Sequence, residues 1–251
     1  MGREDCLNDT LESLSKQTYK DFEVLLITDK GDLSRLRDSG LRSAIGTIVC
    51  FIDDDVYCSE TWLSNVVRVF KEKKEVVGVS GPTTITDAFR NNRDLFRFKR
   101  WKALYDLWFL GRKAAIPGML GNCGAPSTAS NDSGCSFEGE VDYLEACNMS
   151  VKRKEAIDVG GYDYKYYRTS EWCEVDLSLK LGQRGKLWFA PNCKLAHRPS
   201  KAGVYKERLA TKHRWDNFIY FQRKWVKPGF KTYTYRGFIW LYLKLKSHRM
   251  I

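Results

Sequence analysis

Three consecutive aspartates, Asp53, Asp54 and Asp55, follow a short apolar run at residues 47–52. This run contains β-branched residues and is typical of a buried strand. In an open α/β sheet, ligands bind beyond the carboxyl ends of the strands, where these aspartates are expected to lie. Alternation along the strand predicts Asp53 and Asp55 on one side and Asp54 on the other. Two carboxylates on one side can hold a divalent cation that bridges phosphates, whereas a helix cap is the alternative function.

The composition indicates one large domain, or a domain with an extension. The chain has 251 residues, of which 43% are hydrophobic and 29% are charged. Its net charge of +11 favours anionic partners, namely nucleotide phosphates, acidic lipid headgroups or nucleic acid.

The eight cysteines form no C-x-x-C pair, which argues against a zinc ribbon. We therefore expect reduced cysteines and a cytoplasmic protein. The sequence shows no signal peptide and no apolar run of about 18 residues that would span a bilayer.

Helical and strand-like patterns alternate along the first third of the chain. The spacing predicts a helix from Leu7 that ends at residues 17–19, a strand at 23–28, a helix at 33–44 and a strand at 47–52. A further helix begins near Trp62, and a strand follows at 76–80. This alternation predicts an α/β fold with a mostly parallel central sheet flanked by helices.

The middle of the chain has a weaker pattern. Residues 93–110 are rich in cationic and aromatic side chains, and this pattern predicts an amphipathic helix. For residues 111–139 the sequence predicts a long mobile loop. Long loops in compact domains often serve as substrate lids. Further along the chain we expect a strand at 141–144, a short helix at 151–157, a helix at 174–181 and an extended segment at 186–189.

Seven motifs in order resemble the family 2 glycosyltransferases, which have a nucleotide-diphosphosugar-binding α/β fold called GT-A. The similar motifs are Leu-Glu-Ser-Leu-Ser-Lys-Gln-Thr-Tyr at 11–19, Asp-Phe-Glu-Val at 21–24 with Asp29, Arg37 with Gly40, Asp53 to Asp55 as the Asp-x-Asp motif, Glu145 to Ser150 followed by Arg153, Gly160-Gly161-Tyr162-Asp163, and Glu174 to Leu177 with the later Pro191 and His197. The resemblance extends from about Leu7 to His197.

Two departures from the family pattern affect the expected nucleotide site. Only six residues precede Leu7, so the family's first strand is expected to be missing. In addition, the family's Asp-Asp-Gly-Ser is here Thr-Asp-Lys-Gly, so only Asp29 of two acidic contacts is retained.

The resemblance assigns expected roles to individual residues. The nucleotide sugar is expected to contact Asp29, Arg37, Asp53 and Asp54. A Mg²⁺ or Mn²⁺ ion is expected on Asp55, Asp53 and His197. Acceptor contacts are expected from Glu145, Asn148 and Trp172. The catalytic carboxylates are Glu174, which aligns with the second acid of the family's pair, and Asp176 as its alternative. The resemblance also implies single displacement with inversion at the sugar.

Each of these assignments has a structural alternative. His197 near a strand end is often structural, and Glu174 and Asp176 at a helix start are also suitable helix caps. Asn148 can equally satisfy the backbone of a turn, and Trp172 can belong to the core. For Asp163 a role in the Gly-Gly turn is the preferred interpretation.

Residues 201–251 continue beyond the family match and mix cations with large aromatic side chains. This mixture favours the water–lipid interface, and we expect peripheral membrane contact through this segment. Packing against the core is the alternative. Single-stranded nucleic acid is not an expected partner, because no recognised nucleic-acid motif is present.

The sequence therefore predicts a GT-A domain at residues 1–200 and a basic, aromatic helical extension at 201–251. The expected function is metal-dependent transfer of a sugar from a nucleotide-diphosphate sugar to a glycan or lipid-linked acceptor. The expected location is cytoplasmic, with the cytoplasmic face of a membrane as an option. Two rivals are an inactive glycosyltransferase-like scaffold that binds a membrane or partner, and a nucleotidyltransferase. The latter would ordinarily carry a glycine-rich phosphate loop, which this chain lacks.

Overall fold

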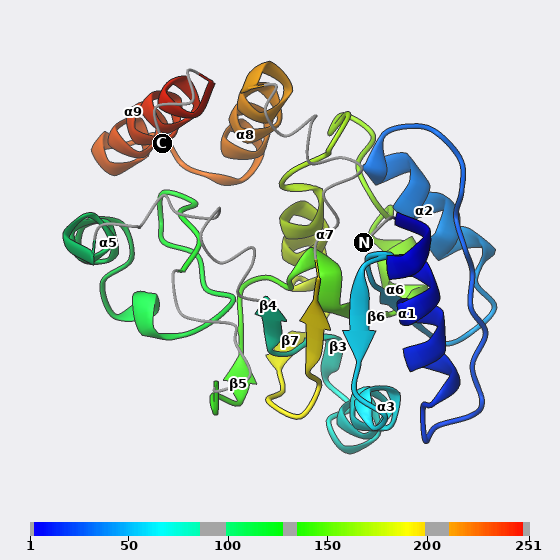
Figure 1. Cartoon of the computed structure of the whole chain (residues 1–251). Helices are drawn as coiled ribbons and strands as arrows, with labels where there is room; N and C mark the ends of the chain where they lie inside the picture. The colour runs from blue at the N-terminus through cyan, green and yellow to red at the C-terminus, as the bar shows by residue number, and fades with distance from the viewer. Residues whose placement is uncertain (1–2, 86–98, 128–134, 199–210, 248–251) are drawn as a thin grey trace.

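A computed structural model describes residues 3–85, 99–127, 135–198 and 211–247 (Figure 1). Its helices are α1 (Arg3–Ser15), α2 (Leu33–Ser43), α3 (Trp62–Glu72), α5 (Lys99–Tyr105), the π-helix η1 (Asp106–Leu110), the 3-10 helices η2 (Gly111–Ala115) and η3 (Ala146–Asn148), α6 (Arg153–Asp158), α7 (Cys173–Leu181), α8 (Thr211–Trp225) and α9 (Phe230–Ser247). Its strands are β1 (Ile48–Phe51), β2 (Val56–Cys58), β3 (Val76–Ser80), β4 (Thr83–Ile85), β5 (Gly139–Glu140), β6 (Met149–Lys152), β7 (Lys186–Phe189) and β8 (Leu195–His197).

The predicted α/β architecture is confirmed, but the sheet is mixed rather than mostly parallel. Its five strands have the order β1-β6-β3-β7-β5, and a smaller sheet has the order β2-β8-β4. In the larger sheet only β3 and β7 run parallel, because β6 pairs antiparallel with both β1 and β3. Helix–strand alternation predicts the direction of consecutive strands only. It carries no information on β6, which enters the sheet after a long irregular segment.

Hydrophobic cores cover both faces of the larger sheet. On one face, Val77 of β3 belongs to a core that includes residues of α2, α6 and α7. On the other face, Val76 and Val79 pack with residues of α1 and α3. The central strand is buried throughout, which explains its continuous apolar sequence.

The predicted strand at residues 23–28 is not formed. Val24 and Leu26 are exposed, and this segment pairs with no strand in the described parts of the chain. A strand requires a neighbour for its backbone groups, which sequence periodicity does not reveal. The segment is instead held by Glu23, whose carboxylate accepts a hydrogen bond from the Ile45 N–H at 2.8 Å, and by Ile27, which lies against Gly40.

The predictions for residues 141–157 are also corrected. Residues 141–144 are buried but form no strand, because the Val141 N–H donates to Leu187 and the Tyr143 N–H donates to Gly118. The strand is β6, which occupies the first part of the predicted helix at 151–157. Residues 149, 150 and 151 are all buried, as expected for a strand covered on both faces of the sheet.

The loop predicted at 111–139 is packed where the structure describes it. Leu120, Cys123 and Ala125 are buried, and the Gly121 N–H donates to the Ala125 carbonyl at 2.8 Å. Residues 117–127 are therefore packed against the folded core and do not have the character of an open lid. Residues 128–134 and the first part of the helix predicted at 93–110 lie outside the described residues, whereas residues 99–110 are helical as predicted.

The described part of the C-terminal extension is helical and packs on the rest of the protein. Helices α5, α8 and α9 lie together at one end of the molecule, and α1, α2 and α6 lie at the other (Figure 1). Tyr105, Phe218 and Tyr235 form a core that joins α5, α8 and α9.

The close approach of two backbone segments at Gly81 provides a test of the fold. A Cβ at Gly81 would overlap the carbonyl oxygens of Cys193 and Ala190, which belong to the backbone and cannot move aside cheaply. Gly81→Ala is expected to lower the free energy of unfolding by about 3 kcal/mol in urea titrations. The matched control Gly237→Ala has open space in the middle of α9 and is expected to raise stability by up to ~1 kcal/mol. Equal effects of the two substitutions would contradict the packing at Gly81.

Candidate active site

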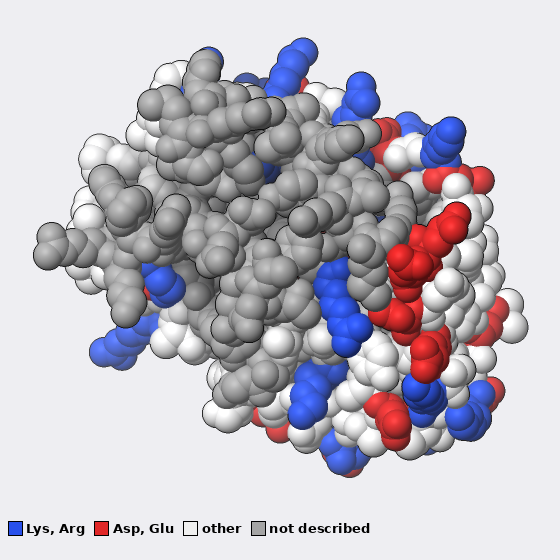
Figure 2. Space-filling model, in the orientation of Figure 1, with Lys and Arg blue, Asp and Glu red and all other residues white. Residues whose placement is uncertain are grey.

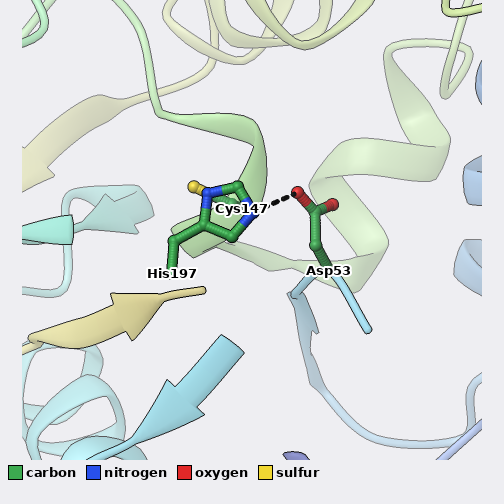
Figure 3. Close-up of side chains that lie close together, drawn as sticks. All are labelled: Asp53, Cys147 and His197. Atoms are coloured by element: carbon green, nitrogen blue, oxygen red, sulfur yellow. Dashed lines mark ion pairs between the residues drawn. The ribbon is translucent and has the colours of Figure 1, made fainter. Parts of the chain in front are cut away.

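Two of the three aspartates converge on one histidine, as Figure 3 shows for Asp53. The antiparallel register of β2 and β8 pairs Val56 with His197 and so places Asp55 beside this histidine. The His197 Nε2 atom lies 2.9 Å from a carboxylate oxygen of Asp55 and 3.8 Å from one of Asp53. The predicted metal ligands are therefore brought together within ion-pair distance. Cys147 lies in the same cluster, since its sulfur and the ligand atoms of Asp53 and His197 lie within 4.8 Å of one another.

Arg37 connects the aspartates to Glu174. One Nη atom lies 3.7 Å from Asp53 and the other lies 4.0 Å from Glu174. The guanidinium also donates to the Cys173 sulfur at 3.6 Å. Helix α2 presents Arg37 between the end of β1 and the start of α7, so this cation holds two separate carboxylates near one another.

Glu174 lies in the first turn of α7 and its side chain is 23% exposed. Burial raises the pKa of its carboxyl above the ordinary 4.5, although the nearby Arg37 guanidinium opposes this effect. A carboxylate with a raised pKa accepts a proton more readily, which suits a general base.

A strained turn precedes Glu174. Arg168, Ser170 and Trp172 have φ angles of 59°, 48° and 76°, which are unfavourable for residues other than glycine. Three such residues within five positions require support from their surroundings.

The start of α2 supplies this support. The Asp32 carboxylate accepts the Arg168 N–H at 2.6 Å, and the Leu33 N–H donates to the Arg168 carbonyl at 3.0 Å. The Ser34 hydroxyl donates to the Tyr166 carbonyl at 2.6 Å. The helix that presents Arg37 therefore also fixes the turn that presents Glu174.

Asp176, the second predicted catalytic carboxylate, does not join this cluster. Its side chain is fully buried and lies 2.7 Å from Lys224 and 3.1 Å from Lys180. It also accepts the Trp225 indole N–H at 2.7 Å. These contacts anchor α8 to α7, so the position of Asp176 is that of a structural carboxylate.

The predicted acceptor residues have different surroundings. Asn148 is buried; its Oδ1 accepts the Trp62 indole N–H at 3.1 Å, and its Nδ2 donates to the carbonyls of Gly81 and Cys193 at 3.0 and 2.8 Å. Its amide is therefore occupied by the protein and fastens the turn after β3. Glu145 precedes η3 and is only partly exposed.

Trp172 is half-buried and stacks on Phe221 of α8, with ring centroids 4.5 Å apart. It adjoins Cys173 and Glu174 at the start of α7, so it combines a packing role with proximity to the predicted base. The remaining predicted nucleotide contacts are Asp29 and Asp54. Asp29 is exposed on the segment before α2, and Asp54 lies in the turn after β1, where its carbonyl accepts the Thr10 hydroxyl at 3.1 Å.

Cys147 and Asp38 also shape the site, and neither is among the site residues predicted from the sequence. Cys147 lies on η3 and His197 on β8, so their proximity arises from elements that are distant in sequence. The Asp38 carboxylate is fully buried and accepts hydrogen bonds from the Tyr162 N–H at 3.0 Å and from the Arg42 side chain at 2.7 Å. The sequence does contain a signal for the Asp38–Arg42 pair, because an acid one helical turn before an arginine can pair with it on a helix.

The cluster combines carboxylates, an imidazole and a cation beyond the end of β1, with the partly buried carboxylate of Glu174 opposite them. Such a group can bind a cation and phosphate on one side and receive a proton on the other. Residues 29–124 match the model of the family Glycosyl transferase family 2.

Two solved structures share the fold at low sequence identity. The mannosyltransferase PcManGT from Pyrobaculum calidifontis, in complex with GDP-Man and Mn²⁺, has a TM-score of 0.52 and 14% identity, covering 96% of this chain and 66% of that chain. S. aureus TarS has a TM-score of 0.53 and 12% identity, covering 88% of this chain and 61% of that chain. The chain therefore has the GT-A fold. The residues that match family 2 of the glycosyltransferases make up less than half of the chain, and this part of the chain is similar to that family.

One curated protein is also similar in sequence. The glucosyl-dolichyl phosphate glucuronosyltransferase of Haloferax volcanii is 21% identical over 195 residues, which cover 65% of this chain and 53% of that protein. The chain thus spans about half the length of this curated relative.

The occupied amide of Asn148 predicts a role in stability. Asn148→Ala leaves the Trp62 indole and two buried carbonyls without a partner, and we expect a loss of about 2 kcal/mol or more in the free energy of unfolding. Asn65→Ala is the matched control, because this amide donates to the Asn192 carbonyl at the surface and should cost less than about 1 kcal/mol. A stable Asn148→Ala variant would favour the acceptor role predicted from the sequence.

Proposed function

We propose that this chain transfers a sugar from a nucleotide-diphosphate sugar to a lipid-linked or glycan acceptor, with inversion at the sugar. The observation that carries this proposal is the placement of Arg37 between Asp53 and Glu174. This cation joins the residues proposed for the donor diphosphate to the residue proposed as the base. The family match and the GT-A fold support the same reaction class.

The residues around His197 fit a divalent metal ion. The His197 Nε2 atom lies within 4 Å of a carboxylate oxygen of Asp53 and of one of Asp55, and donors of these kinds suit Mn²⁺ or Mg²⁺. The Cys147 thiol is a softer donor, and we leave it outside the proposed ligand set. Asp53, Asp55 and His197 would hold the ion, which would neutralise the diphosphate leaving group. The Mn²⁺ in the PcManGT complex supports a divalent metal for this chain.

The proton of the acceptor hydroxyl goes to Glu174 in this proposal. Its raised pKa makes it a stronger base, and the Arg37 guanidinium favours its ionised form against the effect of burial. Asp176 would act as a positioning residue, since its carboxylate holds Lys224 and Trp225. Trp172 would form one wall of the acceptor site next to Glu174.

A lipid-linked acceptor is the preferred class. The Haloferax volcanii relative is named for a glucosyl-dolichyl phosphate, which is a lipid-linked sugar. The sequence of residues 201–251 mixes cations with aromatic rings, which suits an acceptor presented at a membrane surface.

Calorimetric titration of UDP, GDP and dTDP, with and without Mn²⁺, tests the donor and metal sites. One nucleotide is expected to bind more tightly with Mn²⁺, and Asp55→Ala is expected to weaken that binding at least about tenfold by removing a ligand. Asp158→Ala is the control, since this acid pairs with Lys154 at the surface. Melting curves must show that both variants fold. Absence of binding by any nucleotide in the folded wild-type chain would favour the inactive scaffold.

Because the pKa of Glu174 is raised, loss of its negative charge is expected to lower activity but not stability. The native state binds this proton more tightly than the unfolded state, so the contribution to stability is present below about pH 4.5 and is lost as the pH rises through the native pKa. Glu174→Gln resembles the protonated form. It is expected to reduce sugar transfer at least about a hundredfold, whereas its melting temperature at pH 7 should equal or exceed that of wild type.

Wild-type activity should fall as the pH decreases through the native pKa of Glu174. Asp176→Asn serves as the contrasting variant, because it weakens the buried pairs with Lys180 and Lys224 and should lower the melting temperature. If the Glu174→Gln variant transferred sugar at the wild-type rate, the assignment of Glu174 as the base would be wrong, whatever the stability of the variant.

A further inference from the structure

Helix α9 has one exposed face that is apolar. Phe230, Tyr233, Trp240 and Leu241 recur at helical spacing and are all exposed, with Phe230 at 74%. The opposite face is buried against the protein through Tyr235 and other residues. The helix is therefore held in place by one side and presents large apolar side chains on the other.

The α5–η1 segment continues this face. Leu104, Leu107 and Trp108 follow helical spacing and are exposed, with Leu107 at 77%. The ring centroids of Trp108 and Phe230 lie 6.3 Å apart, and the Trp108 indole N–H donates to the Thr234 hydroxyl at 3.4 Å. These contacts join two segments that are distant in sequence. We call their shared exposed surface the α5–α9 face; its residues are Leu104, Leu107, Trp108, Phe230, Tyr233, Trp240 and Leu241.

Cations accompany the rings of this face. Lys231 lies 5.6 Å from the Trp108 ring, Arg236 lies 5.5 Å from Tyr233 and Lys244 lies 5.7 Å from Trp240. The sequence of α9 contains no Asp or Glu.

One acidic side chain lies within the α5–η1 segment itself. Asp106 of η1 is paired with Lys102 at 2.6 Å. Figure 2 shows Asp and Glu side chains gathered over α1, at the end of the molecule opposite α9 in Figure 1. The charge distribution around the α5–α9 face is therefore suited to an anionic surface.

We propose that the α5–α9 face binds the surface of an anionic lipid bilayer. This proposal deepens the proposed function and rests on it for the lipid-linked acceptor. Trp and Tyr prefer the water–lipid interface, aliphatic side chains enter the acyl boundary, and Lys and Arg contact anionic headgroups. The described part of the chain contains no helix with the length and hydropathy of a membrane span.

The face is also connected to the candidate active site. Phe218 of α8 packs with Tyr235 of α9 at a centroid distance of 5.6 Å, and the same Phe218 packs with Trp172 at 5.6 Å. One aromatic side chain therefore lies between the bilayer-binding helix and the residue proposed to bound the acceptor site.

Vesicle sedimentation tests the apolar part of the proposal. Phosphatidylcholine vesicles with phosphatidylserine should bind the wild-type chain, and pure phosphatidylcholine vesicles should bind it more weakly. The double substitution Leu107→Ala with Leu241→Ala should weaken partitioning at least about tenfold. The matched control is Leu25→Ala with Ile45→Ala, which removes exposed aliphatic side chains outside the face and should leave partitioning unchanged. Equal losses for both pairs would overturn the proposal.

Charge reversal tests the electrostatic part. Lys231→Glu and Arg236→Glu should each weaken binding to the phosphatidylserine vesicles by about fivefold or more, and added salt should reduce the difference. Lys154→Glu is the control, since its side chain is 82% exposed on α6. Indifference of wild-type binding to phosphatidylserine would overturn the anionic specificity.

Tryptophan quenching locates the contact. Brominated lipids should quench wild-type fluorescence, and Trp108→Phe with Trp240→Phe should remove most of the quenching. Persistent quenching in this variant would place the contact elsewhere. A doubled mass in solution that Leu107→Ala with Leu241→Ala abolishes would also overturn the proposal, because a second copy would then cover the face.

The outcomes separate this proposal from the proposed function. Asp55→Ala should bind vesicles as wild type does, and the variants of the α5–α9 face should retain nucleotide binding. Vesicle binding without nucleotide binding would refute the proposed function alone. Nucleotide binding without vesicle binding would refute the bilayer contact alone.

Discussion

The ion pairs of Arg37 with Asp53 and Glu174 are the interaction on which the candidate site depends. Burial opposes the charge of this guanidinium, but Cys173, Tyr162 and the two carboxylates raise its pKa, so it stays cationic. Without this cation, carboxylates at the end of β1 and at the start of α7 would repel one another across a partly buried space. A single cation on α2 thus fixes the distance between the two halves of the proposed reaction centre.

This arrangement requires that α2 and the turn before α7 move as one unit. Asp32, Leu33 and Ser34 bind the backbone of that turn, and Arg37 follows one helical turn later. The positive φ angles within the turn are tolerated because its carbonyl and N–H groups are hydrogen-bonded to α2. Strain at Arg168 is therefore compensated by the helix that also supplies the guanidinium.

Local patterns predicted the elements, and long-range pairing explains most of the failures. The strands at 48–51, 76–80 and 186–189 and the helix from 173 have strong apolar patterns, and their predicted bounds agree with the structure to within a residue or two. The segment 23–28 has the same apolar character, yet it forms no ladder, because strand formation depends on a neighbour. Likewise, β6 enters antiparallel, which no local pattern specifies.

The predictions for the candidate site also agree with the structure where they depend on local pattern and fail where they depend on distant partners. The two carboxylates of Asp53 and Asp55 were predicted on one side from strand alternation, and both lie near His197. By contrast, Asp176 and Asn148 have the residue types of a polar site, but their partners make them structural. Those partners, Lys224 and Trp62, lie on helices whose positions sequence spacing does not provide. Residue type predicts which side chains could take part in binding or catalysis. Their burial and their partners in the fold determine which of them are available for that role.

Helix α8 connects the candidate active site to helix α9 through charged and aromatic contacts. Lys224 lies 2.8 Å from Asp163 and 2.7 Å from Asp176, so it ties the Gly-Gly turn and α7 to α8. Burial raises the pKa of Asp163, but hydrogen bonds from Lys224, the Lys165 N–H and Tyr220 lower it to about 2. The pair therefore remains charged at neutral pH. Because α9 packs on α8 through aromatic rings, a force applied to α9 at a membrane would be transmitted to α7 through charged and aromatic contacts. The C-terminal helices thus form part of the support of Glu174, and the α5–α9 face and the candidate active site belong to one packed unit.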